Sequence, residues 1–274
     1  MRREEGITDG ETLKMGSAVD SLCSALGVGD REQIALVGGG GKTSLMFSLV
    51  EELVSKGMRV VTGTTTRVLK SEAKRAPCVI FLAPGSDLNQ TVRPLLEKHG
   101  QVFVGRDLSR KGKILGISPS DADLLYREPW INYLILESDG SAGLPVKAPA
   151  EHEPVIPESS SLVVALMGLE ALGVPFEESL VFRAELFESL TGLKRGESLS
   201  SEVIARVFLS PMGLFKGTPI SARRIVFLNK LDLIPDDEDA RRLANLLLAD
   251  PFSGIETVVI GSLAKGVYFR ARRA

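Results

Sequence analysis

The chain has 274 residues, of which 44% are hydrophobic and 25% charged, a composition typical of a globular protein with a sizeable core. Its 33 Lys and Arg residues face 35 Asp and Glu residues, so it lacks the strong positive charge that attracts nucleic acid or anionic membranes. The two cysteines, Cys23 and Cys78, form no CxxC pair and favour a reducing compartment. With a polar N-terminus and no apolar run long enough to span a bilayer, the sequence predicts a cytoplasmic protein without nucleic-acid or membrane partners.

Short apolar runs recur along the chain with helical patterns between them. The runs cover residues 33–37, 58–63, 78–83, 101–105, 133–137, 162–167, 224–229 and 257–261. The clearest helical patterns cover residues 43–55 and 236–248. Strands that alternate with helices predict an α/β fold, with a mostly parallel sheet and helices on both faces.

The domain organisation follows from the same patterns. Residues 1–30 read as a loose tail, up to residue 16, and a short helix over 17–26. Residues 31–274 form one α/β domain. Within it, 183–211 contains two helical patterns and predicts a small helical insertion against one edge of the sheet.

A glycine-rich loop joins the first apolar run to the first clear helix. It consists of Gly38, Gly39, Gly40, Gly41, Lys42, Thr43 and Ser44. The loop departs from the full GxxxxGK[ST] motif at Leu36 and matches a shorter GxxGKT form. Glycines allow backbone N–H groups to turn toward an anion, and the helix adds its positive end. We therefore predict a fold of the phosphate-loop NTPase type, with Lys42 on the terminal phosphates and the Thr43 hydroxyl on Mg²⁺. A glycine turn without a ligand is the weaker alternative.

Two acids lie at the end of the apolar run 133–137. Glu137 ends the run and Asp139 lies two residues later, where a phosphate-loop protein needs a carboxylate to orient magnesium or its bound water. Both are candidate metal ligands and catalytic residues, and Glu137 is favoured as the first acid after the strand.

The late run 224–229 leads into an NKxD tetrapeptide. Asn229, Lys230 and Asp232 resemble the guanine-specificity motif of GTPases. The Asp232 carboxylate could accept two guanine hydrogens that adenine does not offer, while Asn229 would brace the neighbouring loop. The segment GSLAKG, residues 261–266, loosely resembles the second base-contact loop of the same proteins. GTP is therefore favoured over ATP, although Asn and Asp after a strand also suit an ordinary turn.

The second apolar run ends in a threonine cluster. Thr64, Thr65, Thr66 and Arg67 lie at the sheet edge where open α/β proteins bind ligands. A threonine could contact the terminal phosphate or magnesium, and Arg67 could offset negative charge that develops during catalysis. A helix cap with a solvated arginine is the alternative interpretation.

Residues 138–157 contain four prolines and neither a helical nor an alternating pattern. A structureless loop of this length is usually functional or disordered. We predict a lid or substrate-facing loop in which Lys147, Glu151 and His152 face a substrate or partner.

Several of these segments together resemble one known family. They are ALVGGGGKTS (35–44), TTTR (64–67), ESDGSAG (137–143), KAPAEHEPVIP (147–157) and the late strand that ends in Asn229. Over most of the chain from about Gln33, the sequence is similar to the YqeC family of candidate accessory proteins for selenium-dependent molybdenum hydroxylases. The resemblance implies a phosphate-loop nucleotide-binding fold and a molybdenum hydroxylase or its cofactor as partner. The pairing of ESDG with FLNKLDL also resembles GTPases that deliver metals to enzymes, but this sequence lacks their Cys and His metal-binding motifs.

These observations support three hypotheses. The first is a Mg²⁺-dependent nucleoside triphosphatase, with Lys42, Glu137, Asp139 and Arg67 as catalytic candidates. The second is an ATP-dependent small-molecule kinase or ligase in which KAPAEHEPVIP holds the acceptor. The third is a nucleotide-sensing module without turnover.

Overall fold

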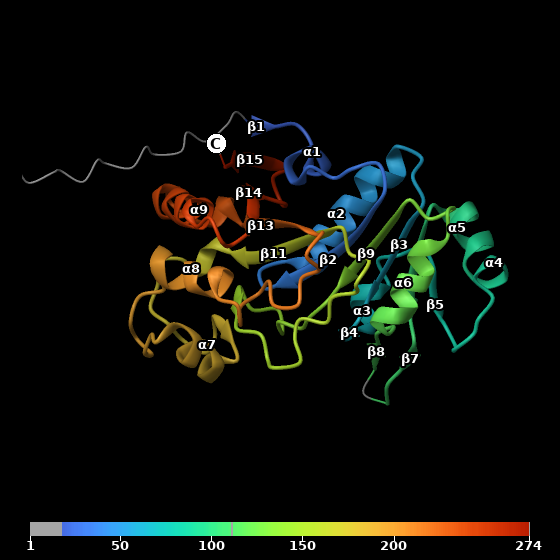
Figure 1. Ribbon diagram of the computed structural model, residues 1–274, viewed down its shortest axis with the longest axis horizontal. Coiled ribbons are helices and arrows are strands. Elements are labelled where there is room, and N and C mark those ends of the chain that lie inside the picture. The colour runs from blue at the N-terminus through green and yellow to red at the C-terminus, as the bar shows by residue number, and fades with distance from the viewer. Residues whose placement is uncertain (1–17, 111, 274) are drawn as a thin grey trace, which may run out of the picture.

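A ten-stranded sheet forms the centre of the molecule in the computed structural model, which describes residues 18–110 and 112–273 (Figure 1). In spatial order the strands are β1 (Ala18–Val19), β15 (Val267–Arg272), β14 (Ile255–Ser262), β13 (Arg223–Asn229), β11 (Leu162–Gly168), β2 (Glu32–Gly38), β9 (Tyr133–Glu137), β3 (Val60–Thr64), β6 (Gln101–Gly105) and β5 (Val79–Phe81). The strands from β14 to β5 are mutually parallel, and β15 and β1 add an antiparallel edge. The predicted mostly parallel α/β fold is confirmed.

Each of the eight apolar runs lies on one of the parallel strands. Strand and run bounds differ by at most two residues. Strands such as β2 and β11 are buried along their whole length. A strand covered on both faces is apolar at nearly every position rather than at alternate positions, which explains the continuous apolar runs in the sequence.

Helices cover both faces of the sheet (Figure 1). One face carries α1 (Leu22–Leu26) and α2 (Lys42–Ser55). The other carries α5 (Arg93–His99) and α6 (Pro119–Arg127) over β3, β6 and β9, and α7 (Ala184–Thr191), α8 (Ser201–Leu209) and α9 (Glu238–Ala249) over β11, β13 and β14. Two short helices, α3 (Lys70–Ala73) and α4 (Leu88–Thr91), complete the α-helices of the described residues. Within 18–110 and 112–273, no helix is long and apolar enough to cross a membrane.

The predicted helical insertion exists, but its position differs from the prediction. Its helices, α7 and α8, share one core with strands β11, β13 and β14, through residues such as Phe187 and Ile204. They therefore cover a face of the sheet instead of an edge, because their apolar sides need more buried area than an edge strand offers. The predicted N-terminal helix is shorter than expected, since α1 begins at Leu22. The predicted tail lies outside the described residues.

Two small sheets lie beside the main one. In the first, β4 (Arg67–Leu69) pairs with β8 (Lys113–Leu115), which pairs with β7 (Asp107–Leu108). In the second, β10 (Val146–Lys147) pairs in parallel with β12 (Val181–Phe182). The segment 138–157, predicted as a structureless lid, thus contains a strand and is buried from Pro145 to Pro149. Prolines restrict the backbone without preventing short parallel pairing next to them.

Candidate functional site

The glycine loop passes from β2 to α2 in a space too small for any side chain. Gly38 and Gly40 have φ angles of +94° and +73°, in the region that favours glycine. A Cβ atom on Gly38 would lie 2.3 Å from the Leu166 carbonyl oxygen, and one on Gly40 would lie 2.1 Å from the Gly168 nitrogen. The glycines let the loop pack against the end of β11 and so fix where α2 begins.

The first turn of α2 offers unpaired N–H groups. Among the described residues, no acceptor pairs with the backbone N–H groups of Gly41, Lys42, Thr43 or Ser44. The first turn of a helix has no internal partners for these groups and carries a partial positive charge. This end of α2 therefore suits an anion such as phosphate.

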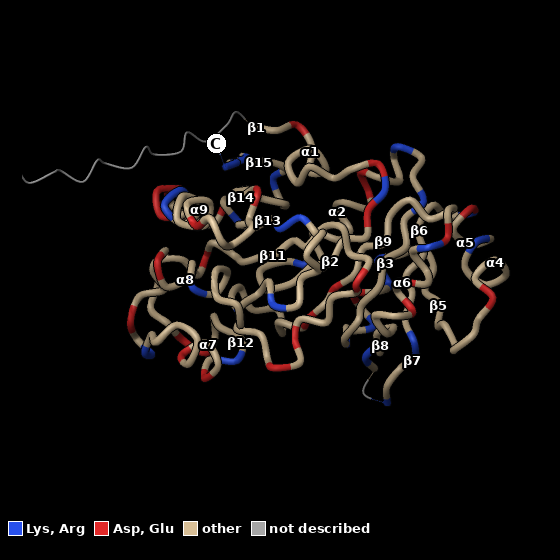
Figure 2. The backbone as a smooth tube through the Cα atoms, viewed as in Figure 1, with Lys and Arg blue, Asp and Glu red and all other residues tan. Residues whose placement is uncertain are grey.

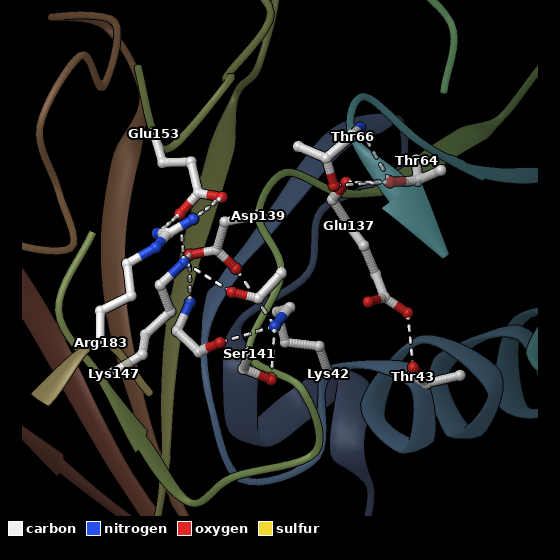
Figure 3. Close-up of polar contacts among 12 residues, drawn as sticks. Lys42, Thr43, Thr64, Thr66, Glu137, Asp139, Ser141, Lys147, Glu153 and Arg183 are labelled. Atoms are coloured by element: carbon white, nitrogen blue, oxygen red, sulfur yellow. Dashed lines mark hydrogen bonds and ion pairs between the residues drawn. The ribbon is translucent and has the colours of Figure 1, made fainter. Parts of the chain in front are cut away.

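Lys42 is buried at the centre of the site (Figure 3). Its Nζ donates to the Gly38 carbonyl oxygen at 2.6 Å, lies 3.1 Å from Asp139 Oδ1 and donates to Ser141 Oγ at 3.3 Å. The lysine thus folds back over the glycine loop, at the position where terminal phosphates would meet it.

Glu137 and Thr43 form a separate pair. Thr43 Oγ1 donates to Glu137 Oε1 at 2.6 Å (Figure 3), and Glu137 is only 5% exposed. Burial raises the pKa of Glu137, although Lys42 and the Thr43 hydroxyl act in the opposite direction. A buried carboxylate beside a hydroxyl is a pair of hard oxygen donors that gains from a cation.

Asp139 has a different environment. Its Oδ2 accepts from the Gly38 backbone N–H at 2.9 Å and lies 3.1 Å from Lys147 Nζ, while its Oδ1 faces Lys42. Asp139 therefore ties the glycine loop to two lysines. The sequence favours Glu137 over Asp139 as the metal ligand; this geometry is compatible with that preference and gives Asp139 a positioning role.

Lys147 does not face a substrate or partner, contrary to our prediction. Its side chain is 0% exposed, donates to the Gly140 carbonyl oxygen at 2.7 Å and pairs with Glu153 at 2.6 Å. Arg183, which the sequence analysis missed, also pairs with Glu153 (Figure 3). Burial alone raises the pKa of Glu153, but the hydrogen bonds from Arg183 and Lys147 outweigh it and lower the pKa to about 2. Glu151 and His152 are exposed on the same segment.

The threonine cluster supports the strand ends. Thr64 Oγ1 donates to the Glu137 carbonyl oxygen at 2.8 Å and lies 3.2 Å from Thr66 Oγ1, while Thr65 Oγ1 donates to the Val155 carbonyl oxygen at 2.7 Å. These hydroxyls are used within the protein, so the geometry does not favour the predicted phosphate or magnesium contact. Strand β3 lies directly beside β9, which explains why its terminal threonines reach Glu137.

The NKxD segment lies next to the glycine loop. Asn229 Nδ2 donates to the Gly40 carbonyl oxygen at 2.9 Å, and Asn229 Oδ1 accepts from the Leu263 N–H at 3.2 Å. Asn229 therefore links the glycine loop to the segment 261–266. Asp232, the middle residue of the short helix η2 (Leu231–Leu233), is exposed and accepts from the Ser262 hydroxyl. Lys230 pairs with Glu170, in the short helix η1 (Leu169–Ala171).

A cavity of about 700 Å³ opens over these groups. The predicted site residues that line it are Gly41, Lys42, Thr43, Ser44, Arg67, Glu137, Asp139 and Lys230. Residues that the sequence analysis did not single out complete the wall, among them Glu72, Lys113 and Phe182. They lie far from the glycine loop in sequence and share no motif with it, so no local pattern could have identified them. In the described residues, no group of three or more His, Cys, Asp or Glu side chains could hold a metal ion.

Comparison with known proteins identifies the family of this chain. The family model for the YqeC protein matches residues 34–185, which include the glycine loop, both acids and the Lys147 segment. The protein described as "Uncharacterized protein YqeC" from Escherichia coli (strain K12) is 31% identical over 258 residues, covering 91% of this chain and 95% of that protein. The chain belongs to the YqeC family.

Proposed function

We propose that this protein binds a nucleoside triphosphate together with Mg²⁺ and hydrolyses it. The supporting observation is that Lys42, the free N–H groups of α2 and the Thr43–Glu137 pair converge on one cavity. Each of the three matches a different part of the ligand: the terminal phosphate, the phosphate oxygens and the metal.

The residues present fit Mg²⁺. Thr43 and Glu137 would hold the ion, since a hydroxyl and a carboxylate suit a hard cation that shares its remaining positions with water and phosphate oxygens. Burial raises the pKa of Glu137, and a cation beside the carboxylate would favour its charged form. A bound magnesium ion neutralises charge on the transferred phosphoryl group.

The charge of the buried network also suits an anion. Lys42, Lys147 and Arg183 supply three positive charges, and Asp139 and Glu153 supply two negative ones. Asp139 faces both lysines, and Glu153 pairs with both Lys147 and Arg183, so one excess positive charge is shared across the network that includes Lys42. In this scheme Lys42 contacts the terminal phosphate while Asp139 keeps the glycine loop in place.

Guanine is the base that we propose. The Asp232 carboxylate is held by Ser262 and remains exposed, and Asn229 joins its segment to the glycine loop. A carboxylate fixed in this way can accept two hydrogens from guanine, which adenine cannot donate.

An ATP-dependent kinase or ligase is the second candidate. Arg67 and Lys113, from the neighbouring strands β4 and β8, line the cavity together with Lys42. Two further cations in the same cavity would suit a second substrate with negative charge. In a triphosphatase, Arg67 would instead offset charge in the transition state.

For the biological role, we propose maturation of a selenium-dependent molybdenum hydroxylase, with the enzyme or its cofactor as partner. The family resemblance in the sequence supports this role, in which turnover at the glycine loop would drive a step on the partner.

The experiment is calorimetric titration of the purified protein with GTP and ATP in the presence of Mg²⁺, followed by steady-state phosphate release. We expect GTP to bind more tightly by about tenfold or more, and Lys42→Ala to abolish binding in a folded protein. Lys56→Ala, at the exposed end of the same helix, is the matched control and should bind normally.

Unchanged affinity in folded Lys42→Ala would reject the phosphate site. Phosphate release only with an added acceptor would support the kinase or ligase, and binding without any release would support a nucleotide sensor.

A further inference from the structure

A second cavity lies at the amino ends of the parallel strands, whereas the glycine loop lies at their carboxyl ends. It has a volume of about 560 Å³, and its lining includes Gly27, Arg223, Thr257, Arg270, Arg272 and Arg273. We call it the arginine cavity. Arg223 begins β13 and Arg272 ends the antiparallel β15, so the cavity lies at the amino ends of the parallel strands. The seven residues of β13 place it roughly 20 Å from the carboxyl edge.

Strand register brings three of these arginines to one face. Arg272 pairs with Thr257 across β15 and β14, Arg270 pairs with Val259, and Arg223 pairs with Leu162. Paired residues of neighbouring strands share a face, and both Val259 and Leu162 belong to the core beneath α1 and α2. The three arginines therefore converge beside the end of α1, and Figure 2 shows Lys and Arg gathered around β15.

Ion pairs and hydrogen bonds within the protein engage only part of the positive charge of these arginines. Arg223 pairs with Glu32, and its Nη1 donates to the Gly27 carbonyl oxygen at 2.8 Å. Arg270 Nη1 donates to the Ser24 carbonyl oxygen at 3.0 Å. These contacts satisfy carbonyl groups at the C-terminal end of α1, and they use one carboxylate.

The remaining positive charge has no partner in the described part of the chain. No carboxylate there forms an ion pair with Arg270 or Arg272, and Arg270 Nε is buried without a hydrogen-bond partner. Glu256 lines the cavity and is exposed. Burial lowers the pKa of Arg270, and the nearby charges of Arg272 and Arg223 lower it further, as expected for like charges held close together.

We propose that the arginine cavity binds a small oxyanion with two or more negative charges, held by Arg270, Arg272 and Arg273. Guanidinium groups match the planar oxygen pairs of phosphate and carboxylate and can bind them in a bidentate manner. Such a ligand would relieve the repulsion between the arginines. The cavity volume suits a small molecule, and the site is separate from the glycine loop.

The test uses full-length Lys42→Ala protein, so that a phosphate compound has no lysine to bind at the glycine loop. Calorimetric titrations with inorganic pyrophosphate and with citrate, a tricarboxylate, distinguish a phosphate ligand from a carboxylate ligand. We expect one of the two to bind, more weakly as salt rises. Arg272→Gln should weaken binding by at least about tenfold, which corresponds to about 1.4 kcal/mol. Lys98→Gln, which removes an exposed charge on α5, should not.

Absence of binding by both anions, or equal binding by Arg272→Gln and its parent, would overturn the proposal. If Lys42→Ala does not fold, the same titrations are made on the wild-type protein and on Arg272→Gln alone. The wild type should then show two binding steps, one at the glycine loop and one at the arginine cavity, and Arg272→Gln must remove one of them. Triphosphate binding at the glycine loop should survive Arg272→Gln, so failure of this inference is distinguishable from failure of the proposed function.

Discussion

At the scale of single residues, two acids separated by one position have different partners. Both acids line the cavity, but Glu137 bonds Thr43, whereas Asp139 bonds the Gly38 N–H and faces two lysines. Removing one member of a buried ion network leaves its partners uncompensated, which is costly. Removing a carboxylate that serves a metal affects chemistry more than folding.

Glu137→Gln should therefore keep the fold and triphosphate binding but lose Mg²⁺-dependent phosphate release, since an amide cannot replace the carboxylate as a magnesium ligand. Phosphate release as a function of Mg²⁺ concentration measures this. Asp139→Asn is the comparison and should lower the unfolding free energy instead. The opposite pattern in the two variants would exchange the roles assigned here.

Lys147→Met should destabilise the protein by about 3–5 kcal/mol, because Asp139 and Glu153 lose a buried partner. Urea unfolding followed by circular dichroism measures the loss. Lys216→Met is the control, because Lys216 bonds only carbonyl oxygens of the same segment, and it should cost less. A fully stable Lys147→Met protein would restore the substrate-facing interpretation of this lysine.

Asp232→Asn tests the identity of the base. The variant would place an amide donor against a guanine donor and should weaken GTP binding by about 2–4 kcal/mol. Xanthosine triphosphate, which has a carbonyl oxygen at that position, should bind more tightly than before. Competition titrations of GTP, ATP and xanthosine triphosphate on both proteins measure the change. Equal binding of GTP and ATP by the wild type, unaffected by the substitution, would leave the NKxD segment as an ordinary turn.

At the scale of elements, the turn between β2 and α2 depends on backbone that approaches β11 closely. Gly40 and Gly57 have similar φ angles of +73° and +76°, but a Cβ on Gly57 would meet nothing within 4 Å. A substitution at Gly57 therefore tests the effect of a positive φ on stability alone, whereas one at Gly40 tests a positive φ together with close packing.

We expect Gly57→Ala to cost about 1–2 kcal/mol through its backbone conformation alone. Gly40→Ala should cost more and should also abolish triphosphate binding, because the loop must move away from β11. Thermal unfolding and GTP titration of both variants provide the measurement. Equal stability of the two variants would show that the close contact at Gly40 is relieved without consequence.

At the scale of the whole molecule, stability depends on pH through acids with opposite pKa shifts. The folded pKa of Glu153 is about 2, so its contribution is complete above about pH 5 and is lost as the pH falls toward 2. The pKa of Glu137 is raised in the folded state. Its contribution to the unfolding free energy therefore has the opposite pH dependence, and it favours the folded state more at low pH than at high pH. A cation bound at Glu137 would reverse that penalty at neutral pH.

The unfolding free energy of the wild type should accordingly fall between about pH 5 and pH 3. Glu153→Gln should be less stable at pH 7 and should lose less on acidification, because its side chain no longer titrates. Urea titrations at a series of pH values give both curves. Parallel curves for the two proteins would assign the acid sensitivity to other carboxylates.

Much of the architecture was determined by the sequence itself. The parallel strands are buried on both faces, so each one appears as a continuous apolar run, and the glycine loop combines glycines with a lysine in consecutive positions. Such features depend on neighbours along the chain and can be read without the fold. The glycine loop, Glu137 and the NKxD segment were identified in this way, and the structure brings them to one edge of the sheet.

Other features were decided only by the tertiary structure. Lys147 looked like a polar residue in a proline-rich loop, but parallel pairing of β10 with β12 buries it beside Asp139 and brings Arg183 to Glu153. The different partners of Glu137 and Asp139 depend on the turn after β9, which directs one carboxylate to α2 and the other to the glycine loop. Ion pairs and cavity walls join residues that are distant in sequence, so their energies depend on burial and on partners that no local pattern contains.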